Sequence, residues 1–176
     1  MAHSLILIPV REAEFVVRPR LERSSPECLS PDPDETAAHI TLLGPFADLT
    51  AIDHGLVSEL RDFFADVLPF GYELTGINHF PGGTTYLSPE PAAPFRTLTH
   101  ELFKHFPEFP HYGGEFDEVV PHLSVPIPGD EDVDTLRFEL ETRLPISAHA
   151  REAWLYWWEP GKCHNLETFT FGTTAA

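Results

Sequence analysis

The hydrophobic pattern of this chain predicts an order of strands and helices that occurs twice. A linking helix at 94–106 separates two series, each made of one strand, one helix and two further strands. The first series covers 38–43, 51–67, 70–80 and 84–87, and the second covers 119–127, 133–144, 150–158 and 166–171. Helices are indicated by apolar residues three and four positions apart, and strands by short apolar runs between glycine and proline turns.

Strand pairs that alternate with helices are typical of α+β folds, in which helices pack on a mainly antiparallel sheet. We therefore expect an α+β, bilobal fold with two pseudo-symmetric lobes and a central cleft. Each lobe would hold a mainly antiparallel β-sheet with helices on its outer face. Residues 1–176 are expected to form a single bilobal domain, with repeat halves at 36–90 and 119–172. Ligands are expected to bind in the groove between the lobes.

Acidic residues outnumber basic ones by a margin that excludes several kinds of partner. The 28 Asp and Glu against 11 Lys and Arg give a formal charge of −17. Such a surface repels duplex DNA and anionic membranes, since binding to either requires clusters of Lys and Arg. A small nucleotide or a short oligonucleotide phosphate in a cleft remains compatible with this charge, because local groups determine its binding.

The segment before the first series contains an apolar run at 4–9, typical of a buried strand, and a polar, proline-rich stretch at 22–35, typical of a surface loop. Four arginines lie close together here, interleaved with glutamates: Arg11, Arg18, Arg20 and Arg23. A salt-bridged, solvated loop is the favoured interpretation of these arginines, and a phosphate clamp is the alternative.

Composition also indicates the cellular compartment of the protein. No apolar run approaches the ~20 residues of a membrane span, and the first ten residues lack the basic start of a signal peptide. The two cysteines, Cys28 and Cys163, are too few for a disulfide framework or a cysteine-rich zinc cluster. We expect a cytoplasmic monomer.

Two of the ten histidines share a local pattern of histidine, apolar residue, hydroxyl residue and apolar residue. His39 and Thr41 belong to the first occurrence, His-Ile-Thr-Leu at 39–42. His122 and Ser124 belong to the second, His-Leu-Ser-Val at 122–125, 83 residues further along. Because side chains alternate between the two faces of a strand, each imidazole shares a face with its hydroxyl while the apolar residues point to the core.

Two such strands facing each other would place two imidazoles and two hydroxyls around one cavity. Histidine has an unperturbed pKa of about 6.5, so it can serve as general base or general acid near neutral pH. Hydroxyls can donate hydrogen bonds to phosphate oxygens and stabilise the charge that develops there. The pattern therefore predicts phosphodiester chemistry with His39 and His122 as catalytic residues. The sequence leaves open which is the acid and which the base.

The segments His-Ile-Thr-Leu-Leu-Gly-Pro-Phe at 39–46 and Val-Pro-His-Leu-Ser-Val at 120–125 resemble the paired motifs of the 2H phosphoesterase superfamily, which includes 2′-5′ RNA ligase-like proteins and cyclic phosphodiesterases. Tyr-Gly-Gly-Glu-Phe at 112–116 resembles the bacterial 2′-5′ RNA ligase-like branch. The resemblance implies a bilobal fold, metal-independent phosphoesterase activity, and phosphate-binding roles for Thr41 and Ser124. Ser124 stands where threonine is commoner, and it keeps the hydroxyl.

Other aromatic side chains are candidates for contact with a nucleobase. Phe46 and Tyr86 are candidates to bind substrate by stacking, and core packing is the favoured interpretation of Phe46. Trp154, Tyr156 and Trp158 alternate along one strand and are interpreted as core.

No metal and no other cofactor is expected, because neither motif histidine has an Asp, Glu or His two or four residues away on its strand. We expect a phosphoric diester hydrolase acting on a 2′,3′-cyclic nucleotide, or on a 2′-5′-linked or short RNA end in RNA processing. A non-catalytic nucleotide- or RNA-end-binding module that retains the cleft is the alternative. A structural duplicated domain whose motifs are coincidental is a third possibility.

Overall fold

The computed structural model describes residues 2–109 and 119–172 of the 176-residue chain, and within these ranges it contains eight strands and four α-helices. The strands are β1 (His3–Pro9), β2 (His39–Leu43), β3 (Phe70–His79), β4 (Thr85–Glu90), β5 (Leu123–Ser124), β6 (Ile146–Ala150), β7 (Glu152–Trp158) and β8 (His164–Thr170). The helices are α1 (Glu14–Ser24), α2 (His54–Ala65), α3 (Ala93–His105) and α4 (Val133–Leu140).

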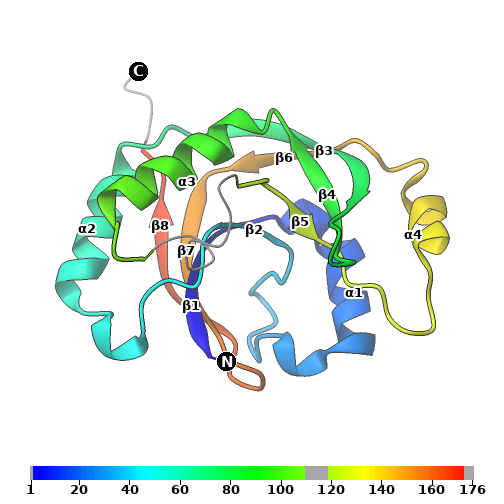
Figure 1. The fold of residues 1–176 in the computed structure, drawn as a ribbon, viewed down its shortest axis with the longest axis horizontal. Coiled ribbons are helices and arrows are strands. Elements are labelled where there is room, and N and C mark those ends of the chain that lie inside the picture. The colour runs from blue at the N-terminus through cyan, green and yellow to red at the C-terminus, as the bar shows by residue number, and fades with distance from the viewer. Residues whose placement is uncertain (1, 110–118, 173–176) are drawn as a thin grey trace.

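All eight strands belong to one curled, antiparallel sheet in the order β6-β3-β4-β5-β2-β1-β7-β8 (Figure 1). The predicted α+β class with mainly antiparallel strands is therefore confirmed. The sheet is continuous from β6 at one edge to β8 at the other, because β5 and β2 pair at its centre through Leu123 and Ile40.

The predicted repeat range 36–90 contributes strands to both halves of this sheet. The range 36–90 contributes β2 to one half and β3 and β4 to the other. Because β1 is buried from Ser4 to Pro9, the backbone N–H and C=O groups on both of its edges need partners, and it pairs with β2 on one edge and β7 on the other.

The sheet buries apolar residues on both of its faces. Ile8, Ile40 and Leu42 belong to the main core, on the side where α3 packs against β2 and the Thr99 hydroxyl donates to the Leu42 carbonyl at 2.9 Å. The opposite face of β1 and β7 carries a smaller cluster made of Leu5, Leu7, Trp154, Tyr156 and Cys163. Figure 1 shows α2 and α3 at one end of the molecule and α1 and α4 at the other.

The arginine-rich segment predicted as a solvated loop forms α1 instead. Its polar, proline-containing sequence has no clear amphipathic pattern, and the helix is held by contacts distant in sequence. Arg20 is buried with only 3% of its surface exposed, and it pairs with Glu131 and Glu139. Arg23 also pairs with Glu131. These arginines therefore bridge α1 to the segment around α4.

Three other predicted elements differ in extent. The predicted strand at 119–127 is reduced to β5, and the predicted helix at 133–144 ends at Leu140. The predicted strand at 150–158 begins at Glu152, and β6 precedes it as a separate, unpredicted strand. The predicted turn between β3 and β4 is present, and Gly83 adopts a φ of 93° there, which favours glycine.

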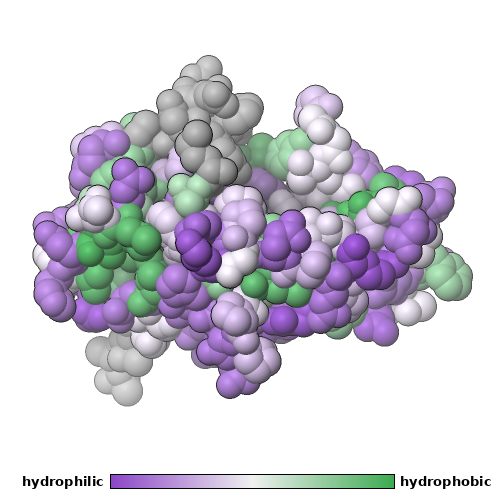
Figure 2. Space-filling model, turned by 90° about the horizontal axis from the view of Figure 1, so that it is seen from below, coloured by the Kyte–Doolittle hydropathy of each residue, from purple (hydrophilic) through white to green (hydrophobic). Residues whose placement is uncertain are grey.

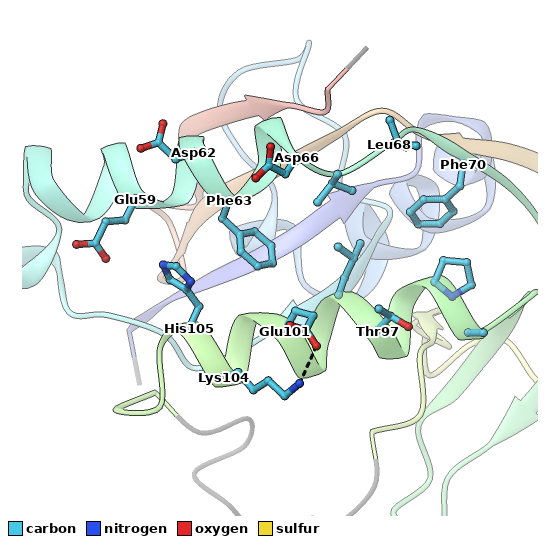
Figure 3. Close-up of a pocket in the computed structure, with 14 residues that line it drawn as sticks. Glu59, Asp62, Phe63, Asp66, Leu68, Phe70, Thr97, Glu101, Lys104 and His105 are labelled. Carbon is cyan, nitrogen blue, oxygen red and sulfur yellow. Dashed lines mark hydrogen bonds and ion pairs between the residues drawn. The ribbon is translucent and has the colours of Figure 1, made fainter. Parts of the chain in front are cut away.

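Hydrophilic residues cover most of the face seen in Figure 2, and hydrophobic residues gather on it in patches. No helix in the described ranges is long and apolar enough to cross a membrane. A cavity of about 1060 Å³ lies between α2 and α3, and Phe63, Leu68 and Phe70 line it together with the acidic residues Glu59 and Asp62 (Figure 3). It contains neither of the two sequence motifs.

Candidate active site

The two histidine motifs lie on neighbouring strands at the centre of the sheet. Ile40 on β2 is paired with Leu123 on β5, and both are fully buried. Since side chains alternate along each strand, the residues on either side of this pair share the opposite face. Extending the antiparallel register places His39 opposite Ser124 and Thr41 opposite His122. The two histidines thus occupy diagonal positions, which in a regular sheet lie about 7–8 Å apart.

Both imidazoles are held in the same way by the backbone. Nδ1 of His39 lies 2.7 Å from the carbonyl oxygen of Ala37, and Nδ1 of His122 lies 2.7 Å from that of Val120. A carbonyl oxygen can only accept, so Nδ1 carries the proton in each ring. In a neutral imidazole this leaves the lone pair on Nε2, which can take a proton from a ligand.

The environment of these rings favours their neutral forms. Burial lowers the pKa of His39 below its ordinary value of 6.5, although the hydrogen bond to Ala37 acts in the opposite direction. The nearby imidazole of His122 lowers this pKa further, and the Glu14 carboxylate raises it. Burial also lowers the pKa of His122, against the effect of its hydrogen bond to Val120. Both histidines are therefore mainly neutral at pH 7 in the free protein.

His122 packs against two aromatic rings. Phe80 meets it edge to face, with ring centroids 4.9 Å apart, and Tyr86 meets it at 5.6 Å. Phe80 and Tyr86 stack on each other at 4.3 Å. Tyr86 also pairs with Ser124 across β4 and β5, so the two side chains share one face of the sheet. The contact of Phe80 with His122 was not predicted, because Phe80 follows the last residue of β3 and belongs to no sequence motif.

His39 is supported from α1 by a carboxylate. Glu14 accepts hydrogen bonds from the backbone N–H groups of Ala37 and Ala38, at 2.9 and 2.8 Å, and from the hydroxyl of Thr36. The Arg18 guanidinium lies 2.7 Å from the same carboxylate. Because Ala37 also supplies the acceptor for His39, Glu14 fixes the backbone that orients this ring.

A cavity of about 460 Å³ opens on the same region. His39 and Ser124 line it, together with Tyr156 and Trp158 from β7 and the turn residue Thr84. Tyr156 is thus buried in the smaller cluster and also borders the cavity, as does Leu7. The alternating aromatic residues of β7 indicated in the sequence that this strand could line a cavity, although core packing was the favoured interpretation.

Three of the four predicted substrate-binding residues, and His122 as well, are not among the described residues that line this cavity. Phe46 is buried in the main core, where its ring packs 5.6 Å from Phe106 and 4.6 Å from Phe109. It does not border the cavity, so the core alternative fits its position. Thr41 and Tyr86 are half-buried beside the histidines but are not among the described residues that line the cavity. The glycine-containing segment at 112–116 lies outside the described residues.

Within residues 2–109 and 119–172, no group of three or more His, Cys, Asp or Glu side chains is arranged to hold a metal ion. The predicted alternative of a phosphate clamp at the arginines also finds no support, because Arg11, Arg18, Arg20 and Arg23 all pair with carboxylates.

Comparison with known proteins assigns the family. The sequence profile of the 2′-5′ RNA ligase superfamily matches residues 9–162, which include both histidine motifs. The chain belongs to the 2′-5′ RNA ligase superfamily. This confirms the resemblance to 2H phosphoesterases. A comparison with curated protein sequences finds no match.

Proteins of two bacteria are among the solved structures of similar fold. Escherichia coli LigT complexed with NADP+ has a TM-score of 0.60 at 17% identity, and LigT complexed with 3′-AMP has 0.58 at 16%. In both, the alignment covers 97% of this chain and 98% of LigT. The protein TT0787 of Thermus thermophilus has a TM-score of 0.58 at 16% identity, with 99% of this chain and 100% of that one covered. These likenesses show that the fold is shared over almost the whole length of each chain.

Proposed function

We propose that this member of the 2′-5′ RNA ligase superfamily is a metal-independent phosphodiesterase that hydrolyses a 2′,3′-cyclic nucleotide phosphate, or a 2′-5′-linked or short RNA end. His39 and His122 act as general acid and general base. The observation that carries the proposal is their diagonal arrangement on one face of the sheet, with His39 on β2 and His122 directly before β5, and each ring held through Nδ1 with Nε2 left for proton transfer.

The reaction needs one neutral and one protonated imidazole. Nε2 of the neutral ring takes a proton from water, whose oxygen forms a bond to phosphorus. The bond from phosphorus to one ribose oxygen breaks, and the protonated ring supplies a proton to that leaving oxygen. The products are a ring-opened phosphomonoester and a free hydroxyl, and the two histidines have exchanged protonation states. Each proton transfer contributes typically about 10²–10⁴-fold to the rate.

The hydroxyl groups and the substrate's own charge complete the scheme. Thr41 and Ser124 lie opposite the two histidines in the extended register, and in this scheme their hydroxyls donate hydrogen bonds to the non-bridging phosphate oxygens. The negative charge of the bound phosphate raises the pKa of an adjacent imidazole, so one ring of the pair becomes protonated in the complex. Nucleotide complexes of LigT, with 3′-AMP and NADP+, agree with a nucleotide ligand for this fold.

The test is hydrolysis of cyclic nucleotides by the purified chain and by His39→Ala and His122→Ala. Each variant is expected to lose activity by at least about 10²-fold while it remains folded. His164→Ala is the matched control, because His164 also contacts the carbonyl two residues earlier at 2.7 Å but lies exposed on β8. Activity is expected to persist in the presence of chelators. Substantial activity in either motif variant would exclude the two-histidine scheme.

The non-catalytic module makes a different prediction in the same assay. It would bind the cyclic nucleotide in calorimetry and leave it unchanged, as shown by product analysis. The structural-domain possibility predicts no binding at all. A panel of 2′,3′-cyclic, 2′-5′-linked and ADP-ribose cyclic phosphates therefore separates the three.

A further inference from the structure

We propose that the cavity beside His39 selects substrates in which the phosphodiester is the only negatively charged group, such as a nucleoside 2′,3′-cyclic phosphate with a free 5′-hydroxyl. Substrates with additional phosphates, including oligonucleotide ends, would be selected against by charge. This inference rests on the proposed function of the same site and specifies its substrate class.

The described residues that line the cavity include no lysine and no arginine. They also include no aspartate and no glutamate. His39 is the one lining residue of the described set that can become a cation. The segment at 110–118, which the structure does not describe, contains no lysine or arginine in its sequence. One imidazolium can balance one phosphate charge, and a second phosphate would find no cation beside it.

Most basic residues of the chain form ion pairs with carboxylates, and none of the described Lys and Arg residues lines the cavity. Eight of the 11 Lys and Arg residues form ion pairs with carboxylates: Arg11, Arg18, Arg20, Arg23, Arg61, Lys104, Arg137 and Lys162. Arg143 lies over the ring of Phe15, 4.6 Å from its centroid. Neither Arg143 nor the remaining two, Arg96 and Arg151, borders the cavity. No basic group of the described chain is therefore free at the cavity to receive a second phosphate.

The walls of the cavity instead suit an uncharged body. Leu7, Val17 and Leu21 contribute apolar surface, and Tyr156 and Trp158 contribute aromatic surface. A cavity of about 460 Å³ is within the range of small-molecule sites and can take a nucleoside. The net charge of −17 repels further phosphates that extend into solvent, and salt screens this repulsion.

The experiment compares three substrates with the full chain: a nucleoside 2′,3′-cyclic phosphate with a 5′-hydroxyl, the same compound with a 5′-phosphate, and a dinucleotide ending in the same cyclic phosphate. We expect kcat/KM to fall at least about tenfold with each added phosphate at low ionic strength, and the ratio to shrink in about 0.5 M salt. Equal or better use of the 5′-phosphorylated compounds would overturn the proposal. So would a discrimination that salt leaves unchanged, since it would be steric. If none of the three is hydrolysed, the proposed function itself fails.

A pair of charge variants tests the cavity directly. Thr84→Lys adds a cation at the rim of the cavity, on an exposed residue of the β3–β4 turn. Thr97→Lys adds the same charge on an exposed residue of α3, in the acidic cavity between α2 and α3. Thr84→Lys is expected to raise kcat/KM for the 5′-phosphorylated compound several-fold relative to the 5′-hydroxyl compound, and Thr97→Lys to leave the ratio unchanged. Equal effects of the two variants would mean that net charge alone governs selection, which contradicts the proposal.

Discussion

Replacement of Glu14 by glutamine tests how the segment that carries His39 is held. The two carboxylate oxygens of Glu14 accept hydrogen bonds from the backbone N–H groups of Ala37 and Ala38. Glutamine has a single acceptor oxygen, so one of these N–H groups would face an amide NH₂ that cannot accept. The charge that pairs with Arg18 is lost as well.

The expected loss of stability follows from these contacts. A buried donor without an acceptor costs about 1–3 kcal/mol, and Ala38 is only 1% exposed. Glu14→Gln should therefore lower the free energy of unfolding by about 1–3 kcal/mol, and Glu14→Ala by more, because it removes both acceptors. Glu22→Gln on the same helix is the control, since Glu22 is exposed, and surface changes of this kind stay within about ±0.5 kcal/mol.

Urea unfolding followed by tryptophan fluorescence measures the stability difference. A second readout is the nitrogen spectrum of the His39 ring, which reports the proton on Nδ1 and its hydrogen bond to Ala37. We expect this signal to shift in Glu14→Gln and to stay unchanged in Glu22→Gln. An unfolding midpoint equal to that of the unmodified chain would refute the reasoning about Glu14. A loss of stability with an unchanged His39 signal would limit Glu14 to a structural role.

Three further outcomes are expected. Because the pKa values of His39 and His122 both lie below 6.5, and one ring must be neutral and the other protonated, kcat/KM should be maximal below pH 6.5 in a pH–rate profile; an optimum above 7 would contradict this. Burial raises the pKa of Glu14, but its hydrogen bonds and the Arg18 charge together outweigh burial and lower this pKa below its ordinary value of 4.5. Its stabilisation is therefore present above pH 4.5 and lost as the pH falls through the lowered pKa, a loss that Glu14→Gln should abolish in acid titrations of stability. The hydroxyl of Tyr72 is buried without a hydrogen-bond partner in the described chain, so Tyr72→Phe should leave thermal stability equal or raise it by up to about 1 kcal/mol; a clear loss would reveal a partner.

Much of the fold could be predicted from local sequence. The amphipathic spacing of α2 and α3 and the apolar runs of β1 and β2 depend only on neighbouring residues, and these elements lie close to where the sequence predicts them. Helix α1 was missed because it lacks such a pattern. Its buried Arg20 is neutralised by Glu131, which is more than one hundred residues away in the chain.

What the sequence determined about the candidate site is the composition of each half. Because side chains alternate between the two faces of a strand, His39 shares a face with Thr41, and His122 shares a face with Ser124. Their apolar neighbours lie on the opposite face. Only the tertiary structure decided that β5 pairs with β2, so that the two imidazoles become diagonal neighbours. It also decided that Phe46 enters the core and that Glu14 supports His39. The physical reason is that strand pairing and packing depend on contacts between residues distant in the chain. The local hydrophobic pattern does not specify which strands will pair.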